Sequence, residues 1–381
     1  MPEPRQILEI AFERARASGS ASIISDKSIT SSVLYVSRCR TRAGIRLLIA
    51  CLLAKIDRPD TDIRKPYTEI GSPDCYSGRM YDETYIGPFI HEKKLPCNPS
   101  TAFLTPCLRN INIPLLSGTA LLGKPMELYE AVIQLLDHVQ NGTIAADDLL
   151  SEAIRCLIVY KNEREEELNA ALNLFKPDGD ALPLSAGAIV QLIEQHLKCQ
   201  WSSRLPVLII AACYNAAVDN LEQQILPMTA HNAADKQTLS LGDVSITLRD
   251  DSGKVVTSYE MKQKSVTQED VDTALNKTLR WPYRIDNYVF ITTDKTEDKV
   301  HEYAAGLYQR TGGIEFSIID CLGFLRHFLH LFHRLRTTFL DEYQKLVLSE
   351  TDSGVGHSLK LAFLALRRAA EDVQPDEEDV V

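Results

Sequence analysis

Asp243, Glu260 and Lys262 are the residues whose types and spacing are best suited to chemistry. The two carboxylates are oxygen ligands of the kind that Mg²⁺ prefers. A divalent cation held between them would neutralise charge building on a phosphate and would lower the pKa of a bound water. Lys262 lies two residues after the glutamate, so on a strand it points the same way and can hydrogen-bond that water or the phosphate. The three residues predict metal-dependent hydrolysis of a phosphodiester.

The stretch 241–264 must form two adjacent strands if these side chains are to meet. Residues 243–248 alternate apolar and polar side chains with the period of a half-buried strand, and Asp250 to Gly253 supply a tight turn. The alternative is an amphipathic hairpin whose charged face is simply solvated. Residues 255–264 would form the second strand, with Tyr259, Met261 and Gln263 on one face and Glu260, Lys262 and Lys264 on the other.

Further metal ligands are predicted close to this hairpin. The backbone carbonyl of Met261 could join the carboxylates around one or two Mg²⁺ ions, for which Mn²⁺ could substitute. A helix predicted over residues 205–226 could supply Glu222, or in second place Asp219, although an exposed helix carboxylate explains either residue at least as well. Lys264 could assist Lys262 or take its role.

The elements after residue 205 alternate between helices and strands. Thr267 is the expected N-cap of one helix, with Asp270 as its capping-box partner. This order indicates an α/β (α+β) fold with a mixed central sheet. The predicted elements are helix 205–226, strands 243–248 and 255–264, helix 267–280, strand 287–292, helix 295–310, strand 314–319 and helix 320–348.

The spacing Asp-x(n)-Glu-x-Lys and the order of elements around it are similar to those of the PD-(D/E)xK nuclease superfamily. Within it, residues 25–335 resemble the SacI family of type II restriction endonucleases. One position departs from the pattern of that family. The family has Arg two residues after the glutamate and Lys two residues further on, whereas this chain has lysine at both positions, Lys262 and Lys264. The resemblance rests on Gly242-Asp243-Val244, the segment 259–265, the strand Tyr288-Val289-Phe290-Ile291, the helix ending LLIACLLAKI, the Tyr81-Asp82 passage and the segment 97–110.

This resemblance implies a Mg²⁺-dependent hydrolase that cuts both strands of double-stranded DNA at a short palindromic site and leaves 5′-phosphate ends. In this reading Asp243 and Glu260 hold the metal, and Lys262 acts on the water or the phosphate. A palindromic site is read by symmetric halves, so we expect a homodimer. A cognate DNA methyltransferase would be its functional companion.

Three parts of the chain are expected. A helical, loop-rich DNA-recognition domain would span 1–200, a PD-(D/E)xK nuclease domain 201–348, and a C-terminal helix with an acidic tail 349–381. The irregular segment 57–124 is rich in proline and tyrosine, and a loop-rich span of this length is unusual unless it has a function. Helices are predicted in the first part at 1–17, 41–56, 125–141, 146–175 and 185–198.

Candidate DNA contacts are polar side chains of the first part that can reach base edges or phosphates. A basic group at Arg38, Arg40, Arg42 and Arg46 could flank a DNA groove or form a solvated helix face. The irregular segment could instead fold over the helices and use its own Asn and Ser side chains to satisfy its backbone. Its candidates are Ser77, Arg79, Tyr81, Asn98, Ser100, Thr101, Arg109 and Asn110.

Three histidines, His327, His330 and His333, invite a metal interpretation, but they share a helix face only loosely and lie among arginines. A basic, exposed or DNA-facing helix surface is the favoured explanation, in preference to a zinc site.

Composition limits the classes of protein to consider. The chain has 381 residues, a net charge of −11 and nine cysteines without a CxxC pair, which argues against a disulfide framework or a zinc finger. No apolar run reaches the length of a membrane span, and the first residues lack a signal-peptide core, so a cytoplasmic protein is expected. The negative charge does not exclude DNA, because local basic patches set phosphate affinity.

Two other functions stay open at this point. One is an anti-phage or modification-dependent nuclease with the same core, which would need a pocket for a flipped or modified base. The other is a non-catalytic DNA- or protein-binding scaffold in which the hairpin is only structural.

Overall fold

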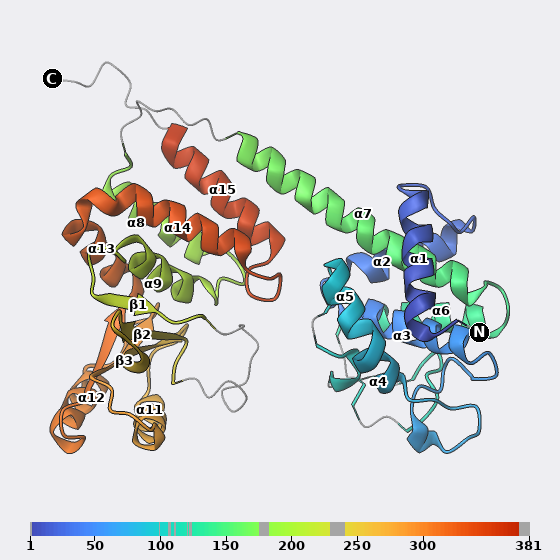
Figure 1. Ribbon diagram of the computed structural model, residues 1–381, viewed down its shortest axis with the longest axis horizontal. Coiled ribbons are helices and arrows are strands. Elements are labelled where there is room, and N and C mark those ends of the chain that lie inside the picture. Colours follow the sequence, from blue (N-terminus) through green and yellow to red (C-terminus); the bar gives the residue numbers. More distant parts are fainter. Residues whose placement is uncertain are drawn as a thin grey trace. The chain divides into compact units, whose positions relative to one another are not determined.

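The computed structural model describes residues 2–98, 100–105, 108–109, 112–119, 121, 124–174, 183–228 and 241–372. Asn110 and the acidic end of the chain lie outside this part. The chain divides into two compact units, Met1–Glu167 and Leu168–Val381, whose helices and strands are labelled in Figure 1. The division therefore falls earlier than the expected boundary at 200/201.

The first unit is helical, and its central helix is α3 (Ala43–Asp57). Every residue from Ala43 to Ala54 is buried, so this helix is covered on all sides and not only along the one apolar face that the sequence pattern predicts. The long helices packed around this core are α1 (Pro4–Ser18), α2 (Lys27–Arg38), α6 (Met126–Gln140) and α7 (Ala146–Asn173), the last running past the end of the unit.

The segment between α3 and α6 is irregular, as predicted, but it contains several short helices. Its large aromatic residues Tyr76, Tyr81, Phe89 and Phe103 are buried in the core of this unit. The segment is therefore part of the folded unit and not a loop lying over it. The short helices are Thr68–Ile70, α4 (Gly78–Tyr81), the π-helix Asp82–Ile86, α5 (Gly87–Lys93) and Ala102–Leu104.

A mixed sheet forms the centre of the second unit, as predicted, and it has five strands where the sequence predicted four. Its order is β1-β2-β3-β4-β5, with antiparallel pairing from β1 to β3 and parallel pairing from β3 to β5. The strands are β1 (Gln223–Ile225), β2 (Val244–Leu248), β3 (Asp251–Lys262), β4 (Asn287–Thr292) and β5 (Glu315–Asp320).

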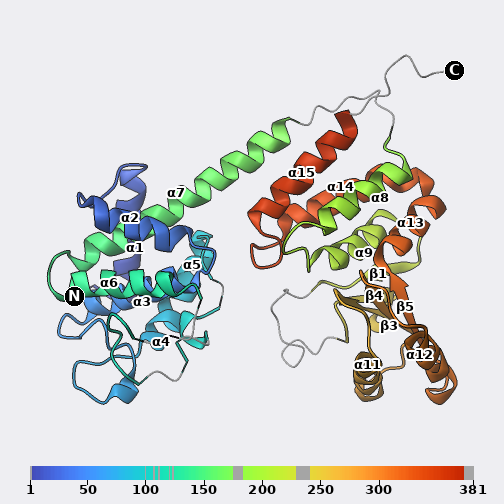
Figure 2. The same ribbon diagram turned by 180° about the vertical axis from the view of Figure 1, so that it is seen from behind.

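Helices cover both faces of this sheet (Figures 1 and 2). Alternate residues of β4 explain why, since Val289 and Ile291 enter one apolar core and Tyr288 and Phe290 enter the other. One face is covered by α11 (Gln268–Arg280) and α12 (Asp298–Arg310). The other carries α8 (Ala186–Leu197), α9 (Leu205–Ala216), α13 (Cys321–Leu331), α14 (Arg336–Ser349) and α15 (His357–Asp372).

Two predicted helices are wrong in length. The helix expected over 205–226 ends at Ala216, and residues 223–225 pair with β2 as an edge strand. The helix expected over 320–348 is interrupted by a 3₁₀ turn at His333–Leu335, which separates α13 from α14. In both places tertiary packing overrides a continuous helical pattern.

The parts 186–197 and 357–372 belong to the same core. His196 of α8 is fully buried, with Nδ1 3.0 Å from the Tyr343 hydroxyl of α14 and Nε2 3.0 Å from the Leu359 carbonyl of α15. Helix α8 is therefore not in the first unit, and α15 does not stand apart from the sheet domain.

Eight cysteines fall in the described part of the chain, and all of them are free thiols. Among the described helices, none combines the length and the apolar character needed to span a bilayer.

Candidate active site

The ends of β2 and β3 bring Asp243 and Glu260 together. Val244 and Tyr259 are the last paired residues, so Asp243 and Glu260 come next along the two antiparallel strands. The Asp243 N–H donates to the Tyr259 carbonyl at 2.8 Å. A Cβ on Gly242 would lie 2.6 Å from that carbonyl oxygen, so the close approach of the strands requires glycine here.

The Asp243 carboxylate is held over the backbone of β3. Its Oδ2 accepts a hydrogen bond of 2.7 Å from the Met261 N–H. Because the N–H and C=O of a strand residue point to the same edge, the Met261 carbonyl is directed toward Asp243 as well. Burial raises the pKa of Asp243, and the negative charge of Glu260 adds to this effect, while the Met261 hydrogen bond opposes it.

Three donors surround the Glu260 carboxylate. Lys262 Nζ lies 2.9 Å from Oε1, and Lys277 Nζ of α11 lies 3.2 Å from Oε2. The hydroxyl of the buried Tyr288 also donates to Oε2. Burial alone would raise the pKa of Glu260, but the Tyr288 hydrogen bond and the two ammonium groups outweigh it, so the pKa lies below its usual value.

Lys262 is shared between two carboxylates. Its Nζ lies 2.9 Å from Glu260 Oε1 and 2.9 Å from Asp270 Oδ1. Burial would lower the pKa of this lysine, but the two carboxylates more than offset it, and the pKa is raised. Lys262 therefore carries its positive charge at neutral pH.

The start of α11 fixes Asp270. Thr267 caps this helix, its side chain accepts from the Asp270 N–H, and Asp270 Oδ2 accepts from the Thr267 N–H at 3.0 Å. The predicted capping box is thus confirmed, and it leaves Oδ1 of Asp270 directed at Lys262. A residue predicted only as part of a helix cap is also a neighbour of the site.

Glu222 and Asp219 lie away from Asp243 and Glu260, so the prediction that either supplies a metal ligand is wrong. The Glu222 carbonyl accepts from the Arg249 N–H at 3.1 Å, at the far end of β2. Asp243 precedes Arg249 by six residues, which corresponds to about 20 Å along an extended strand. Asp219 pairs with Arg249 at 2.9 Å and its side chain is 91% exposed.

Lys264 lies two residues beyond the end of β3 and is exposed. The strand alternation that places Glu260 and Lys262 on one face does not extend to it. This geometry therefore favours Lys262 over Lys264 as the lysine of the candidate site.

Sequence reasoning missed Lys277 and Tyr288. Asp270 and Lys277 are seven residues apart, so they lie on one face of α11, and this spacing was the available signal. Tyr288 had no signal of its own, since a tyrosine in an apolar strand is first interpreted as core. The parallel pairing of β4 with β3 is what sets its ring beside Glu260.

The histidines His327, His330 and His333 are exposed on α13 and the 3₁₀ turn. Within the described residues, no group of three or more His, Cys, Asp and Glu side chains is arranged to hold a metal. A histidine zinc site therefore has no support from the geometry.

Several candidate DNA contacts of the first unit are structural. Tyr81 is buried and donates its hydroxyl hydrogen bond to Asp57, and Thr101 is 7% exposed. Ser77 caps α4 by accepting from the Met80 N–H at 3.2 Å. As placed, Tyr81 and Thr101 cannot reach DNA, because both lie in the core that packs the irregular segment.

The other described candidates of the irregular segment are exposed or half-buried. Arg79 is exposed and pairs with Glu83 at 2.7 Å, and Arg109 is exposed and donates to the Leu104 carbonyl at 3.0 Å. Asn98 Oδ1 accepts from the N–H of the exposed Ser100 at 3.2 Å. These four residues remain candidates for DNA contact.

The basic group at the start of α3 separates into buried and exposed members. Arg46 is 3% exposed and its Nε lies 2.6 Å from Oδ1 of the fully buried Asp82. Arg42 lies over the Tyr160 ring at 4.6 Å, and Arg38 is 2.6 Å from Glu163. Arg46 is therefore a core residue, while Arg38 and Arg40 are exposed and Arg42 is half-buried.

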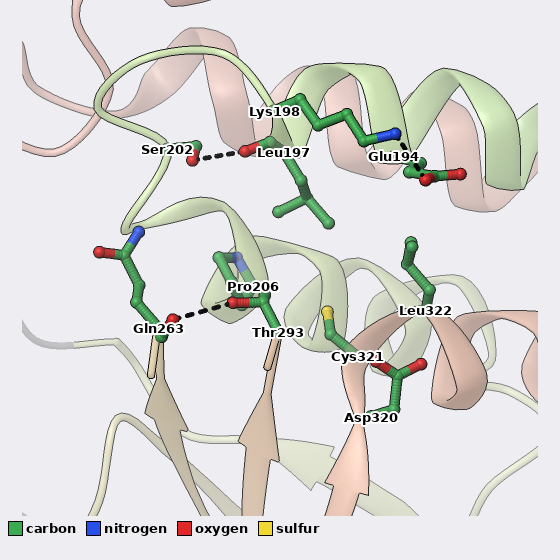
Figure 3. A pocket seen from close by; sticks show the side chains of 10 residues that line it. All are labelled: Glu194, Leu197, Lys198, Ser202, Pro206, Gln263, Thr293, Asp320, Cys321 and Leu322. Carbon is green, nitrogen blue, oxygen red and sulfur yellow. Dashed lines mark hydrogen bonds and ion pairs between the residues drawn. The ribbon is translucent and has the colours of Figure 1, made fainter. Parts of the chain in front are cut away.

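A pocket of about 280 Å³ lies where the carboxyl ends of the parallel strands β3, β4 and β5 meet α8, α9 and α13 (Figure 3). Lys198 and Glu194 form an ion pair of 2.7 Å at its rim. No aromatic ring is present among the ten described residues that line it. They are Glu194, Leu197, Lys198, Ser202, Pro206, Gln263, Thr293, Asp320, Cys321 and Leu322.

Comparison with known proteins gives one family. Residues 180–293 match the model of the SacI restriction endonuclease C-terminal domain, a segment that contains Asp243, Glu260, Lys262 and Lys277. No curated protein matches the chain. The resemblance to SacI-type restriction endonucleases is thereby confirmed, and with it a hydrolase domain that acts on DNA.

Proposed function

We propose that this chain is a type II restriction endonuclease that uses Mg²⁺ to hydrolyse both strands of double-stranded DNA at a short palindromic site and leaves 5′-phosphate ends. The observation that carries the proposal is the convergence of Asp243, Glu260 and Lys262 at the ends of two paired strands, inside the segment that matches the family. The sheet around them is the expected setting for a PD-(D/E)xK site.

The chemistry of this donor set fits a hard divalent cation. Asp243 and Glu260 provide carboxylate oxygens, and the Met261 carbonyl is directed to the same place. The mutual repulsion that helps to raise the pKa of Asp243 is of the kind that a cation between the carboxylates relieves. When bound, Mg²⁺ supplies charge neutralisation at the phosphate and a more acidic water.

Lys262 has the role of a cation and not of a base. Its pKa is raised by Glu260 and Asp270, so it does not take a proton from water at neutral pH. Its ammonium group instead donates hydrogen bonds to a phosphate oxygen or to the attacking water, and so holds the two reactants in line. Asp270 positions it from the start of α11.

The test is digestion of an unmethylated plasmid with Mg²⁺, followed by mapping of the DNA ends. Discrete fragments with 5′-phosphates support the proposal. We expect Asp243→Ala, Glu260→Ala and Lys262→Ala each to abolish cutting while DNA binding in Ca²⁺ persists. Lys264→Ala is the matched control, because Lys264 is exposed beyond the strand end and its loss should leave cutting near the wild-type rate. Cutting by Lys262→Ala at the wild-type rate would refute the assignment of Lys262.

We further propose that the enzyme acts as a homodimer and that a cognate DNA methyltransferase protects the host site. A two-fold axis matches a palindromic site, because each subunit then meets the same half-site. The exposed Arg79, Ser100 and Arg109 and the half-buried Asn98 of the first unit would supply base recognition, with Arg38, Arg40 and Arg42 on the phosphates. Arginine, asparagine and serine are the side chains suited to these contacts.

A further inference from the structure

Both oxygens of the Glu260 carboxylate already accept hydrogen bonds. Oε1 accepts from Lys262, and Oε2 accepts from Lys277 and the Tyr288 hydroxyl, which together take three of about four lone-pair positions. A divalent cation that approaches Glu260 competes with these donors and repels the two ammonium groups. Which one moves follows from how each is held.

Lys277 is the donor best placed to leave. Tyr288 is fully buried, with its ring packed on Phe290 and Phe316, so the ring stays beside Glu260. Asp270, at 2.9 Å, holds Lys262 at the site. The side chains of Lys277 and Lys262 are about equally accessible, 25% and 29% exposed, but Lys277 Nζ lies further from Glu260, at 3.2 Å against 2.9 Å.

The charges of the site fit the binding of both a metal and DNA. Asp243, Glu260 and Asp270 together with Lys262 and Lys277 leave one net negative charge when all are ionised. A divalent cation converts this to one net positive charge, and a phosphodiester then restores neutrality. The charges of these five side chains are balanced only when the metal and the DNA backbone are both bound.

We propose that Lys277 is a second active-site cation, which ion-pairs with Glu260 in the metal-free protein and transfers to a backbone phosphate of DNA when a divalent cation occupies Glu260. This inference rests on the proposed nuclease function and adds a residue to it. Lys277 then couples the two ligands, since metal binding frees a phosphate-binding group and a bound phosphate holds that group away from the metal site.

Direct titration of the full-length protein tests the first half. Mn²⁺ or Ca²⁺ is titrated into wild type, Lys277→Met, Lys277→Gln and Lys277→Arg without DNA. We expect about tenfold tighter metal binding by the Met and Gln variants, because a positive charge that competes for Glu260 has been removed. Lys277→Arg keeps the wild-type value. The control is Lys299→Met on α12, whose lysine pairs with Glu297 at 2.6 Å and is 77% exposed.

The second half is tested with DNA in Ca²⁺ across a range of salt concentrations. Lys277→Met and Lys277→Gln should lower the slope of log affinity against log salt by about 0.9, the value for one lost phosphate contact. Their cutting rate in Mg²⁺ should fall about 100-fold, within the range for losing a group that stabilises charge in the transition state. Lys277→Arg and Lys299→Met should keep the wild-type slope.

Lys277 variants that match Lys299→Met in metal affinity and salt slope, while the wild type cuts DNA, would overturn this inference and leave the nuclease assignment intact. Absence of cutting by the wild type would overturn the nuclease assignment itself. Including both Met and Gln guards against misfolding of one variant, which thermal melting would reveal.

Discussion

Asp243 and Glu260 are neighbours whose pKa values shift in opposite directions. Burial raises the pKa of both, but only Glu260 has a tyrosine hydroxyl and two ammonium groups close enough to reverse the effect. Asp243 has the Met261 N–H and a neighbouring negative charge. As the pH falls, protonation of either carboxylate limits any chemistry that needs both of them ionised.

Tyr288→Phe tests whether the tyrosine hydroxyl lowers the pKa of Glu260. The ring and its packing remain, but the carboxylate loses a hydrogen bond that lowers its pKa. We expect cutting to slow about tenfold, at the low end for one positioned group. The pKa of Glu260 rises, so the acid limb of the rate profile moves to higher pH. Measurement of kcat/KM between pH 5 and 8 in a constant metal concentration checks this, and an unmoved limb contradicts it.

At the scale of elements, the site depends on where β2 begins and where α9 ends. Strand β1 takes the residues that the sequence pattern assigns to the end of a helix, and this carries Glu222 to the far end of β2. Short apolar runs fit a buried helix or a strand equally well, so periodicity could not decide between them. Residues 223–225 form a strand because they pair with residues 246–248, which lie more than 20 positions later in the chain.

Glu222→Ala should therefore leave cutting unchanged. About 20 Å of extended strand separates this residue from Asp243, too far for a shared metal ion. The measurement is the rate of plasmid cleavage by Glu222→Ala, compared with that of Glu260→Ala, which removes a glutamate that does lie in the site. Loss of activity in Glu222→Ala without loss of folding would show that the strand order near the site has been misjudged.

His196 joins three helices in the second unit, and its burial makes the unit sensitive to acid. Burial lowers its pKa from 6.5 to about 4, so the folded protein holds a neutral ring that accepts from Tyr343 and donates to Leu359. Between these pH values the unfolded chain binds the extra proton. The contribution of His196 to the free energy of unfolding is therefore fully present above pH 6.5 and is lost as the pH drops toward 4.

The loss should approach about 3 kcal/mol at pH 4, from the difference between the two pKa values. Denaturant melts of wild type and His196→Gln at several pH values measure it. The variant should be less stable at pH 7, because a fully buried ring that bonds two partners is lost. It should also lose most of the pH dependence between 6.5 and 4. A variant that keeps the wild-type slope would assign the acid sensitivity to other groups.

At the scale of the whole molecule, the sequence was most informative where structure is local. Alternation along residues 243–262, the Thr267 cap and the apolar strand 287–292 were all predicted, and together they place Asp243, Glu260 and Lys262. Partners that meet only through tertiary packing were missed. Lys277 and Tyr288 reach Glu260 from a helix and a strand further along the chain.

The same limit explains the errors in the first unit. Arg46 and Tyr81 look like surface groups in a polar stretch, yet each is buried against an aspartate, Asp82 and Asp57 respectively. A buried charge is tolerated when a partner neutralises it, and the partners lie 36 and 24 residues away in the sequence. Composition alone could not reveal those pairs.

Two units with separate cores suggest a division of labour that mutation can separate. Arg79→Ala and Asn98→Ala alter accessible polar side chains of the first unit, while Asp243, Glu260 and Lys262 are untouched in the second. If the first unit reads the sequence, these variants should bind specific DNA more weakly, by about 1–3 kcal/mol for each lost base contact. They should still cut, with relaxed site selection.

Sequencing of the ends produced from a defined DNA measures this directly. Arg16→Ala is the matched control, because Arg16 is exposed and pairs with Glu13 three residues away, much as Arg79 pairs with Glu83 four residues away. Asp243→Ala completes the comparison, since it should keep the choice of site in a Ca²⁺ binding assay and lose only cutting. Unchanged ends from the Arg79 and Asn98 variants would move base recognition out of this segment, because neither the positions nor the charges they remove would then matter to the choice of DNA.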